Sequence, residues 1–177
     1  MRFVWKELFS QTYMNTSDAG NRYLLRTGNP IVDKSKFIVA QVQHAWEVNA
    51  RQNFIYGVDA LFTRPDTEGT INGRNEDDDN IDEFGGYVQS ETALHDRWDL
   101  VLAARVDDHN QIEDPVFSPR AALQFALADD QKLRATYNRA FSTPSTNNFF
   151  LDLVVLGDLG DFGAATGLGG YDVFARG

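Results

Sequence analysis

The feature that most constrains this chain is a series of long segments in which apolar and polar residues alternate. Each such segment predicts a β-strand, because successive side chains of a strand point to opposite faces of a sheet. The pattern is clearest in RWDLVLAARVD, residues 97–107, where Trp98, Leu102 and Val106 alternate with Arg105 and Asp107. The predicted strands lie near residues 2–13, 35–48, 52–63, 81–94, 97–108, 117–128 and 131–141.

The length of these segments favours strands that cross a membrane. A strand in a globular protein averages about 5–6 residues, whereas a tilted transmembrane strand needs about 9–11. All seven predicted strands reach the longer value. We therefore predict an all-β fold, the antiparallel up-and-down wall of a transmembrane β-barrel, with about seven strands in an open, incomplete barrel. Within the first strand, Glu7 and Gln11 share the face of Trp5 and Phe9, so this strand is ambiguous or lies partly outside the membrane.

Short and long connections alternate along the chain. The short connections are Asn49-Ala50-Arg51, His95-Asp96 and Asp129-Asp130, and the long polar ones are near 14–34, 64–80 and 109–116, with 142–177 after the last strand. Transmembrane barrels have this alternation, because their periplasmic turns are short and their extracellular loops are long. A water-soluble meander has no reason to sort its connections in this way.

The aromatic residues indicate where the two membrane surfaces would lie. Trp5, Trp46 and Trp98 fall at the strand ends that carry short connections, as in an interfacial aromatic belt. Tyr13, Phe62, Phe84, Phe117 and Phe141 lie where strands meet long connections. We predict Trp5, Trp46, Trp98, Phe62, Phe117 and Phe141 as membrane-interface aromatics; ordinary core residues spaced by chance are the alternative. His44 and Arg139 fall on the lipid face near these interfaces, where such side chains reach headgroups.

The opposite face of the predicted strands is polar. It includes Gln41, Gln43 and Gln89 together with the candidate lumen-facing residues Asp59, Glu91, Arg105, Asp107, Arg120, Arg134 and Asn138. These side chains could line a solute path through the barrel or contact a domain inside it. For any individual residue, a hydrated and salt-bridged barrel interior is the favoured interpretation.

Composition and motifs argue against several other functions. The net charge of −10 is unsuited to nucleic acid, and without cysteine there are no disulfides or thiolate metal sites. His44, His95 and His109 lack metal-ligand spacing, and no motif for nucleophilic or zinc catalysis occurs, so we expect neither an enzyme nor a cofactor. The mean hydropathy is −0.39, and no apolar run approaches the roughly 20 residues of a transmembrane helix.

Two loop motifs have a plain interpretation. The acidic run Glu76–Asp79, with Asp82 and Glu83, supplies oxygen ligands that suit Ca²⁺, but it lacks EF-hand spacing. A solvated loop is favoured; in an outer membrane, the carboxylates of loop 76–83 could also share divalent cations with lipopolysaccharide. Gly167-Leu168-Gly169-Gly170 lies in an apparent loop and is not a dinucleotide-binding fingerprint.

Residues 52–153 contain the segments YGVDALFTRPDTEGTING, EFGGYVQSE, SPRAAL, LRATYNRAFSTPS and NNFFLDL. With these segments, residues 52–153 resemble the barrel of the TonB-dependent receptor family. Residues 1–51 match in strand spacing only. The family implies an active importer of ferric siderophores, cobalamin or glycans in the outer membrane of a Gram-negative bacterium. Its partners would be outer-membrane lipid, a plug domain, the TonB system and a small-molecule or glycan cargo.

The resemblance also implies how this chain relates to a whole receptor. A barrel of this type has about 22 strands, so about seven strands do not close by themselves. We expect residues 1–177 to be part of the barrel domain, with neither a plug domain nor a signal peptide. Cargo would be contacted by loops 14–34, 64–80, 109–116 and 142–177. A passive outer-membrane porin and a soluble β-barrel that binds a ligand are the alternative functions.

Overall fold

The computed structural model describes residues 1–25, 27–128, 130–156, 165–167 and 170–176. These residues form two compact units. The first contains Met1–Tyr13, Ile38–Leu61 and Asp82–Ser142, and the second contains Met14–Phe37, Phe62–Ile81 and Thr143–Gly177. Each unit is described by itself below.

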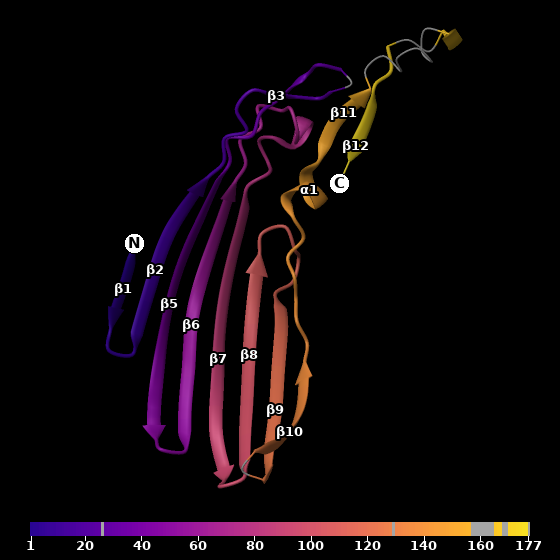
Figure 1. Ribbon diagram of the computed structural model, residues 1–177. Helices are drawn as coiled ribbons and strands as arrows, with labels where there is room; N and C mark the ends of the chain where they lie inside the picture. Colours follow the sequence, from indigo (N-terminus) through magenta and orange to yellow (C-terminus); the bar gives the residue numbers. More distant parts are fainter. Residues whose placement is uncertain (26, 129, 157–164, 168–169, 177) are drawn as a thin grey trace. The chain divides into compact units, whose positions relative to one another are not determined.

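A single antiparallel sheet holds the long strands. Within the described residues it has eight strands, in the order β1-β2-β5-β6-β7-β8-β9-β10, so neighbours in the sheet are also neighbours among the long strands of the chain (Figure 1). The edge strands β1 and β10 do not pair with each other, so the sheet is open. The strands are β1 (Arg2–Trp5), β2 (Leu8–Thr16), β5 (Lys36–Asn49), β6 (Gln52–Arg64), β7 (Ile81–His95), β8 (Trp98–His109), β9 (Val116–Ala128) and β10 (Gln131–Asn138).

This arrangement confirms the predicted all-β, antiparallel, up-and-down sheet. The five strands from β5 to β9 begin and end within one residue of the predicted bounds. Their neighbours are joined alternately by short turns and by long connections, as predicted. Asp129, in the turn predicted between β9 and β10, lies outside the described residues.

The prediction of one strand over residues 2–13 is wrong. The chain turns at Lys6, whose φ is +52°, and β1 folds back on β2 with Trp5 opposite Leu8. The turn was not apparent from the sequence because it contains neither glycine nor asparagine, the residues that most readily adopt positive φ. The hairpin removes the ambiguity of the first strand, because Trp5 and Phe9 now lie on opposite faces. At the other edge, β10 ends at Asn138, before the predicted end at residue 141.

The pairing registers place most of the large apolar side chains of β8 and β9 on one face. Leu102 of β8 lies opposite Ala121 of β9, and Val106 lies opposite Phe117. Arg105 shares the other face with Tyr87 and Ser118. The apolar face is the more exposed of the two: Val58 is 61% exposed, whereas the side chain of Asp59 is 16% exposed. A water-soluble protein shows the reverse, because it buries apolar side chains and exposes charged ones.

The second unit contains the long connections and the tail. Two short strand pairs form here, β3 (Arg22–Tyr23) with β4 (Pro30–Ile31) and β11 (Asp152–Leu156) with β12 (Val173–Arg176). The 3₁₀ helix η1 (Gly73–Asn75) and the helix α1 (Thr146–Phe150) complete it. The sequence indicates a loop over residues 142–177, and within it the structure has α1, β11 and β12. Residues 157–164, 168, 169 and 177 lie outside the described residues, and so does part of the predicted Gly167–Gly170 motif.

Among the residues with described positions, no helix has the length and apolar character needed to cross a membrane.

Candidate functional site

An ion-pair network occupies the polar face of the sheet. The Arg105 guanidinium donates to both carboxylate oxygens of Asp59, from Nη1 to Oδ1 at 2.7 Å and from Nη2 to Oδ2 at 2.9 Å. Its Nε donates to Asp107 Oδ1 at 2.7 Å. A two-point arginine–carboxylate contact is among the stronger and more directional hydrogen-bonded pairs in proteins. One arginine thus joins two carboxylates from two strands, β6 and β8.

Two glycines lack the side chains that would block polar contacts across this face. A Cβ on Gly85 of β7 would lie 2.1 Å from Arg105 Nη2, so the missing side chain allows Arg105 to reach across β7 to Asp59. A Cβ on Gly57 of β6 would lie 2.8 Å from Tyr87 Oη, and Tyr87 crosses there to donate to Gln43 Oε1 at 2.7 Å. A glycine inside a strand often marks a close approach of this kind. That signal was present in FGGY but was not used in predicting the site.

The structure brings together three of the seven candidate residues, Asp59, Arg105 and Asp107. The remaining four lie on the same face by register or contact. Asn138 pairs with Arg120, Arg134 pairs with Gln124, and Glu91 accepts a hydrogen bond from Gln89 Nε2 at 2.7 Å. Contact of any of these residues with a transported solute stays a prediction.

One polar cluster on the apolar face was missed by sequence reasoning. Thr92 Oγ1 donates to Gln52 Oε1 at 2.7 Å, and Gln52 Nε2 donates to Ser90 Oγ at 2.9 Å. Ser90 and Thr92 pair with Leu102 and Leu100, so they lie on the apolar face. Their mutual hydrogen bonds reduce the cost of placing polar groups there.

The tryptophans lie on the apolar face beside the short turns. Trp98 stacks on Phe125 with ring centroids 4.4 Å apart, and Trp46 stacks on Phe54 at 6.0 Å. The Ala45 N–H donates to the Glu7 carbonyl, which sets Leu8 opposite His44 in the antiparallel pair. Trp5, opposite Leu8, therefore lies on the face of Trp46. This placement is the one that an interfacial belt requires, and that role stays a prediction.

The aromatic residues at the other strand ends agree only in part with the sequence. Phe62 lies near the end of β6, and Phe117 lies near the start of β9, where it is exposed. Phe141 was predicted to end the last strand, but it lies three residues beyond the end of β10. On the apolar face, His44 packs against Tyr56 with ring centroids 5.4 Å apart.

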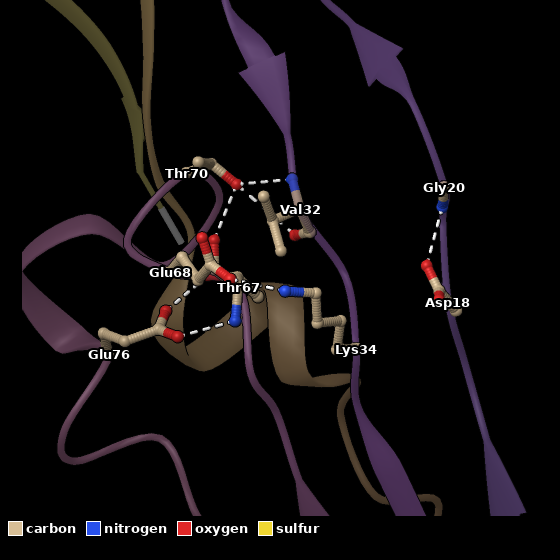
Figure 2. Close-up of polar contacts among 8 residues, drawn as sticks. All are labelled: Asp18, Gly20, Val32, Lys34, Thr67, Glu68, Thr70 and Glu76. Atoms are coloured by element: carbon tan, nitrogen blue, oxygen red, sulfur yellow. Dashed lines mark hydrogen bonds and ion pairs between the residues drawn. The ribbon is translucent and has the colours of Figure 1, made fainter.

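Side-chain hydrogen bonds order the connection between β6 and β7 in the second unit. Figure 2 shows the Glu76 carboxylate accepting from the Thr67 backbone N–H at 2.6 Å and from the Thr67 hydroxyl. The same view shows Thr70 Oγ1 accepting from the Val32 N–H at 2.8 Å. Lys34 Nζ pairs with Glu68 Oε1 at 2.6 Å. These contacts tie the connection between β2 and β5 to the one between β6 and β7.

The acidic run was predicted to be a solvated loop, and this is correct only in part. Asp77 and Asp78 are exposed, but Asp79 is buried and accepts from Asn72 Nδ2 at 2.6 Å. Burial raises the pKa of the Asp79 carboxyl, even though the Asn72 hydrogen bond opposes the shift. No group of three or more histidine or acidic side chains within the described part of the chain is arranged to hold a metal ion.

The Glu76 contacts predict a pH dependence of this connection. Burial would raise the pKa of Glu76, but the hydrogen bonds from Thr67 and neighbouring N–H groups outweigh it and hold the pKa below the ordinary 4.5. A carboxyl with a lowered folded-state pKa contributes stability that is present above pH 4.5 and is lost as the pH falls through the lowered value. We expect the Thr67 amide to lose its protection from hydrogen exchange as the pH falls below 4.5 and through the lowered pKa of Glu76.

The control for this prediction is Glu76→Gln. In this variant the protection of the Thr67 amide is expected to be weaker and nearly constant over the same range. Asp79 acts with the opposite sign, because its raised pKa makes protonation favour the folded state. An equal loss of protection in Glu76→Gln would therefore show that another group controls the connection.

Comparison with known proteins places the chain in a family. The model for "TonB dependent receptor-like, beta-barrel" matches residues 3–172. No curated protein and no solved structure matches the chain. The match covers β2 to β10 and nearly all of the second unit, so it includes both the resemblance seen in 52–153 and the less specific residues before it. The chain belongs to the TonB-dependent receptor-like β-barrel family.

Proposed function

We propose that this chain forms part of the wall of an outer-membrane receptor that imports a scarce nutrient by TonB-dependent transport. The family consists of receptors and transporters of the Gram-negative outer membrane and is not an enzyme family. Its members work with a plug domain, the TonB system and a cargo. The proposal extends these family properties to this chain.

The observation that carries the proposal is the distribution of polarity over the sheet. Val58, Leu102 and Val106 are exposed on one face, while Asp59 and Arg105 are paired on the other. A lipid-facing surface needs the first property, and a hydrated lumen suits the second. A soluble sheet would lose stability and solubility by exposing such an apolar face to water.

The proposed cargo belongs to the classes that the family takes up: ferric siderophores, cobalamin or glycans. In this proposal the long connections contact the cargo, because in transmembrane barrels the long loops are extracellular and the short turns are periplasmic. The polar face that contains Arg105 would then line the path of the cargo or contact the plug.

Uptake by intact cells tests the proposal. The gene that encodes this chain is deleted, and uptake of a labelled ferric siderophore, cobalamin and a maltodextrin is measured separately. We expect the deletion to abolish saturable uptake of one of the three, and the same uptake to stop in cells that lack TonB or are treated with a proton uncoupler.

A passive porin is the alternative that this experiment separates. Diffusion through a porin would continue in cells without TonB and after uncoupling. Uptake could fall when the gene is deleted but stay unchanged in cells that lack TonB and after uncoupling. That result would show that the wall belongs to a passive channel, and it would exclude active transport.

A further inference from the structure

The second unit contains a pocket of about 520 Å³ that the sequence did not indicate. This volume lies in the range of about 300–1,000 Å³ that is usual for small-molecule sites. Its walls include the apolar side chains of Leu24, Pro30, Leu153, Val154 and Phe174, with Arg74 and Arg176 beside them. All of these residues belong to the same compact unit.

The pocket exists because the tail docks on the connection between β6 and β7. The Asp152 N–H donates to the Ile71 carbonyl at 3.0 Å, and Asn75 Nδ2 donates to the Phe150 carbonyl at 2.9 Å. Gly73 permits this contact: its φ is +51°, and a Cβ there would lie 2.4 Å from the Asp152 carbonyl oxygen. Residues far apart in the sequence are thus held together by backbone contacts.

The charges around the pocket do not balance. The Asp152 side chain is 5% exposed, and its Oδ1 accepts from Arg176 Nε at 2.7 Å. Arg74 Nε lies 3.7 Å from Asp152 Oδ2. The hydrogen bond from Arg176 holds the pKa of Asp152 below its ordinary value, so this carboxyl is ionised at neutral pH. Among the described residues that line the pocket, one carboxylate faces two guanidinium groups, which leaves one net positive charge there, although the chain as a whole has a net charge of −10.

The guanidinium group of Arg176 is held in a fixed orientation by two contacts. Arg176 Cζ lies 4.7 Å from the centroid of the Phe174 ring, and Nε is occupied by Asp152. Within the described residues, the terminal amino groups of Arg74 and Arg176 make no hydrogen bond. Half or more of each arginine side chain is exposed. Planar guanidinium groups with free N–H donors match the geometry of a carboxylate.

We propose that this pocket binds a small ligand that carries a carboxylate and an apolar or aromatic body. The carboxylate accepts from the free donors of Arg74 and Arg176, while the body contacts Leu153, Val154 and Phe174. The buried Asp152 holds Arg176 in place and is not itself a ligand contact. This inference rests on the proposed function to the extent that the ligand is part of the imported cargo.

Binding to the full receptor in detergent micelles tests the inference. The probe is 4-fluorobenzoate, observed by fluorine NMR, and its neutral analogue is 4-fluorobenzamide. We expect the benzoate to bind at least about tenfold more tightly than the amide, which is the scale of one charge-assisted hydrogen bond. Arg74→Gln should weaken benzoate binding about tenfold and leave amide binding unchanged.

The variants separate pocket chemistry from folding and from general electrostatics. Arg74→Gln is suited to this test because Arg176 still neutralises the buried Asp152, and an unchanged thermal unfolding midpoint would show that the unit is intact. Lys34→Gln is the matched control, since it removes an exposed cation of the same unit that is paired with Glu68. Arg176→Lys keeps the positive charge but loses the planar guanidinium group with its paired N–H donors. Benzoate binding should therefore fall by less than in Arg74→Gln.

Three results would overturn the inference. The first is equal binding of benzoate and benzamide, and the second is an equal loss in Lys34→Gln and Arg74→Gln. The third is displacement of benzoate by an equimolar amount of inorganic phosphate, which would assign the arginines to oxyanions in general. Binding in micelles needs neither TonB nor a membrane potential, so failure here is distinguishable from failure of the uptake experiment.

Discussion

Replacing Arg105 with methionine is expected to lower the free energy of unfolding by about 2–4 kcal/mol. The substitution leaves Asp59 and Asp107 close together on a partly shielded face without their shared cation. Removing one partner of a buried ion pair typically costs about 3–5 kcal/mol. The lower range applies here because the Arg105 side chain is 36% exposed and solvent screens part of the interaction.

Unfolding by urea in detergent micelles measures this effect. The matched control is Arg120→Met on the neighbouring strand β9, an exposed arginine of the same face, which should change the free energy by less than about 1 kcal/mol. The triple variant Asp59→Asn, Arg105→Met, Asp107→Asn removes both unpaired charges and should recover most of the loss. Equal losses in Arg105→Met and Arg120→Met would contradict the network described here.

Replacing Leu102 with arginine is expected to destabilise the protein in a membrane by about 2–4 kcal/mol. Leu102 lies in the middle of β8 on the apolar face and is 47% exposed. An arginine at this depth would lie in hydrocarbon. In a water-soluble protein, an exposed substitution of this kind usually changes stability by less than about 0.5 kcal/mol, so the size of the effect separates the two settings.

The control is Val101→Arg, one residue away on the polar face. Val101 pairs with Glu91, so the new arginine would face a carboxylate in a hydrated setting and should be tolerated. The measurement is the equilibrium free energy of unfolding in lipid vesicles. If Leu102→Arg and Val101→Arg are equally mild, the apolar face does not contact lipid.

The central part of the fold could be predicted from the sequence because its pattern is locally complete. In β5 to β9 every second position is mostly apolar, and the registers of β7, β8 and β9 keep these positions on one face. The first strand could not be predicted, because the turn at Lys6 leaves no glycine or asparagine signal. Because the chain turns at Lys6, Trp5 shares a face with Leu8 and not with Phe9, so alternation counted along one continuous strand assigns the residues on the two sides of the turn to the wrong common face.

The contacts of the site depend on register, which the sequence does not supply. Asp59, Arg105 and Asp107 were selected as polar residues of one face. Arg105 can cross strand β7 to reach Asp59 because Gly85 has no side chain at that point. The position of Gly85 opposite Asp107 is known only from the strand pairing. The burial of Asp79 and the pocket beside Asp152 arise from residues far apart in the sequence. Local patterns carry no information about such contacts.

Accessibility along β8 tests the central claim that the apolar face contacts lipid and the polar face contacts water. The 177 residues contain no cysteine, so a single introduced cysteine in this part of the protein is unique within it. Spin labels are placed singly at positions 100 to 106 in the receptor reconstituted in lipid, and their collisions with oxygen and with a water-soluble nickel chelate are measured. We predict a period of two, with oxygen favoured at Leu100, Leu102, Ala104 and Val106 and the nickel chelate favoured at Val101, Ala103 and Arg105. Equal access of the nickel chelate to both sets would contradict the assignment of this sheet to a membrane wall.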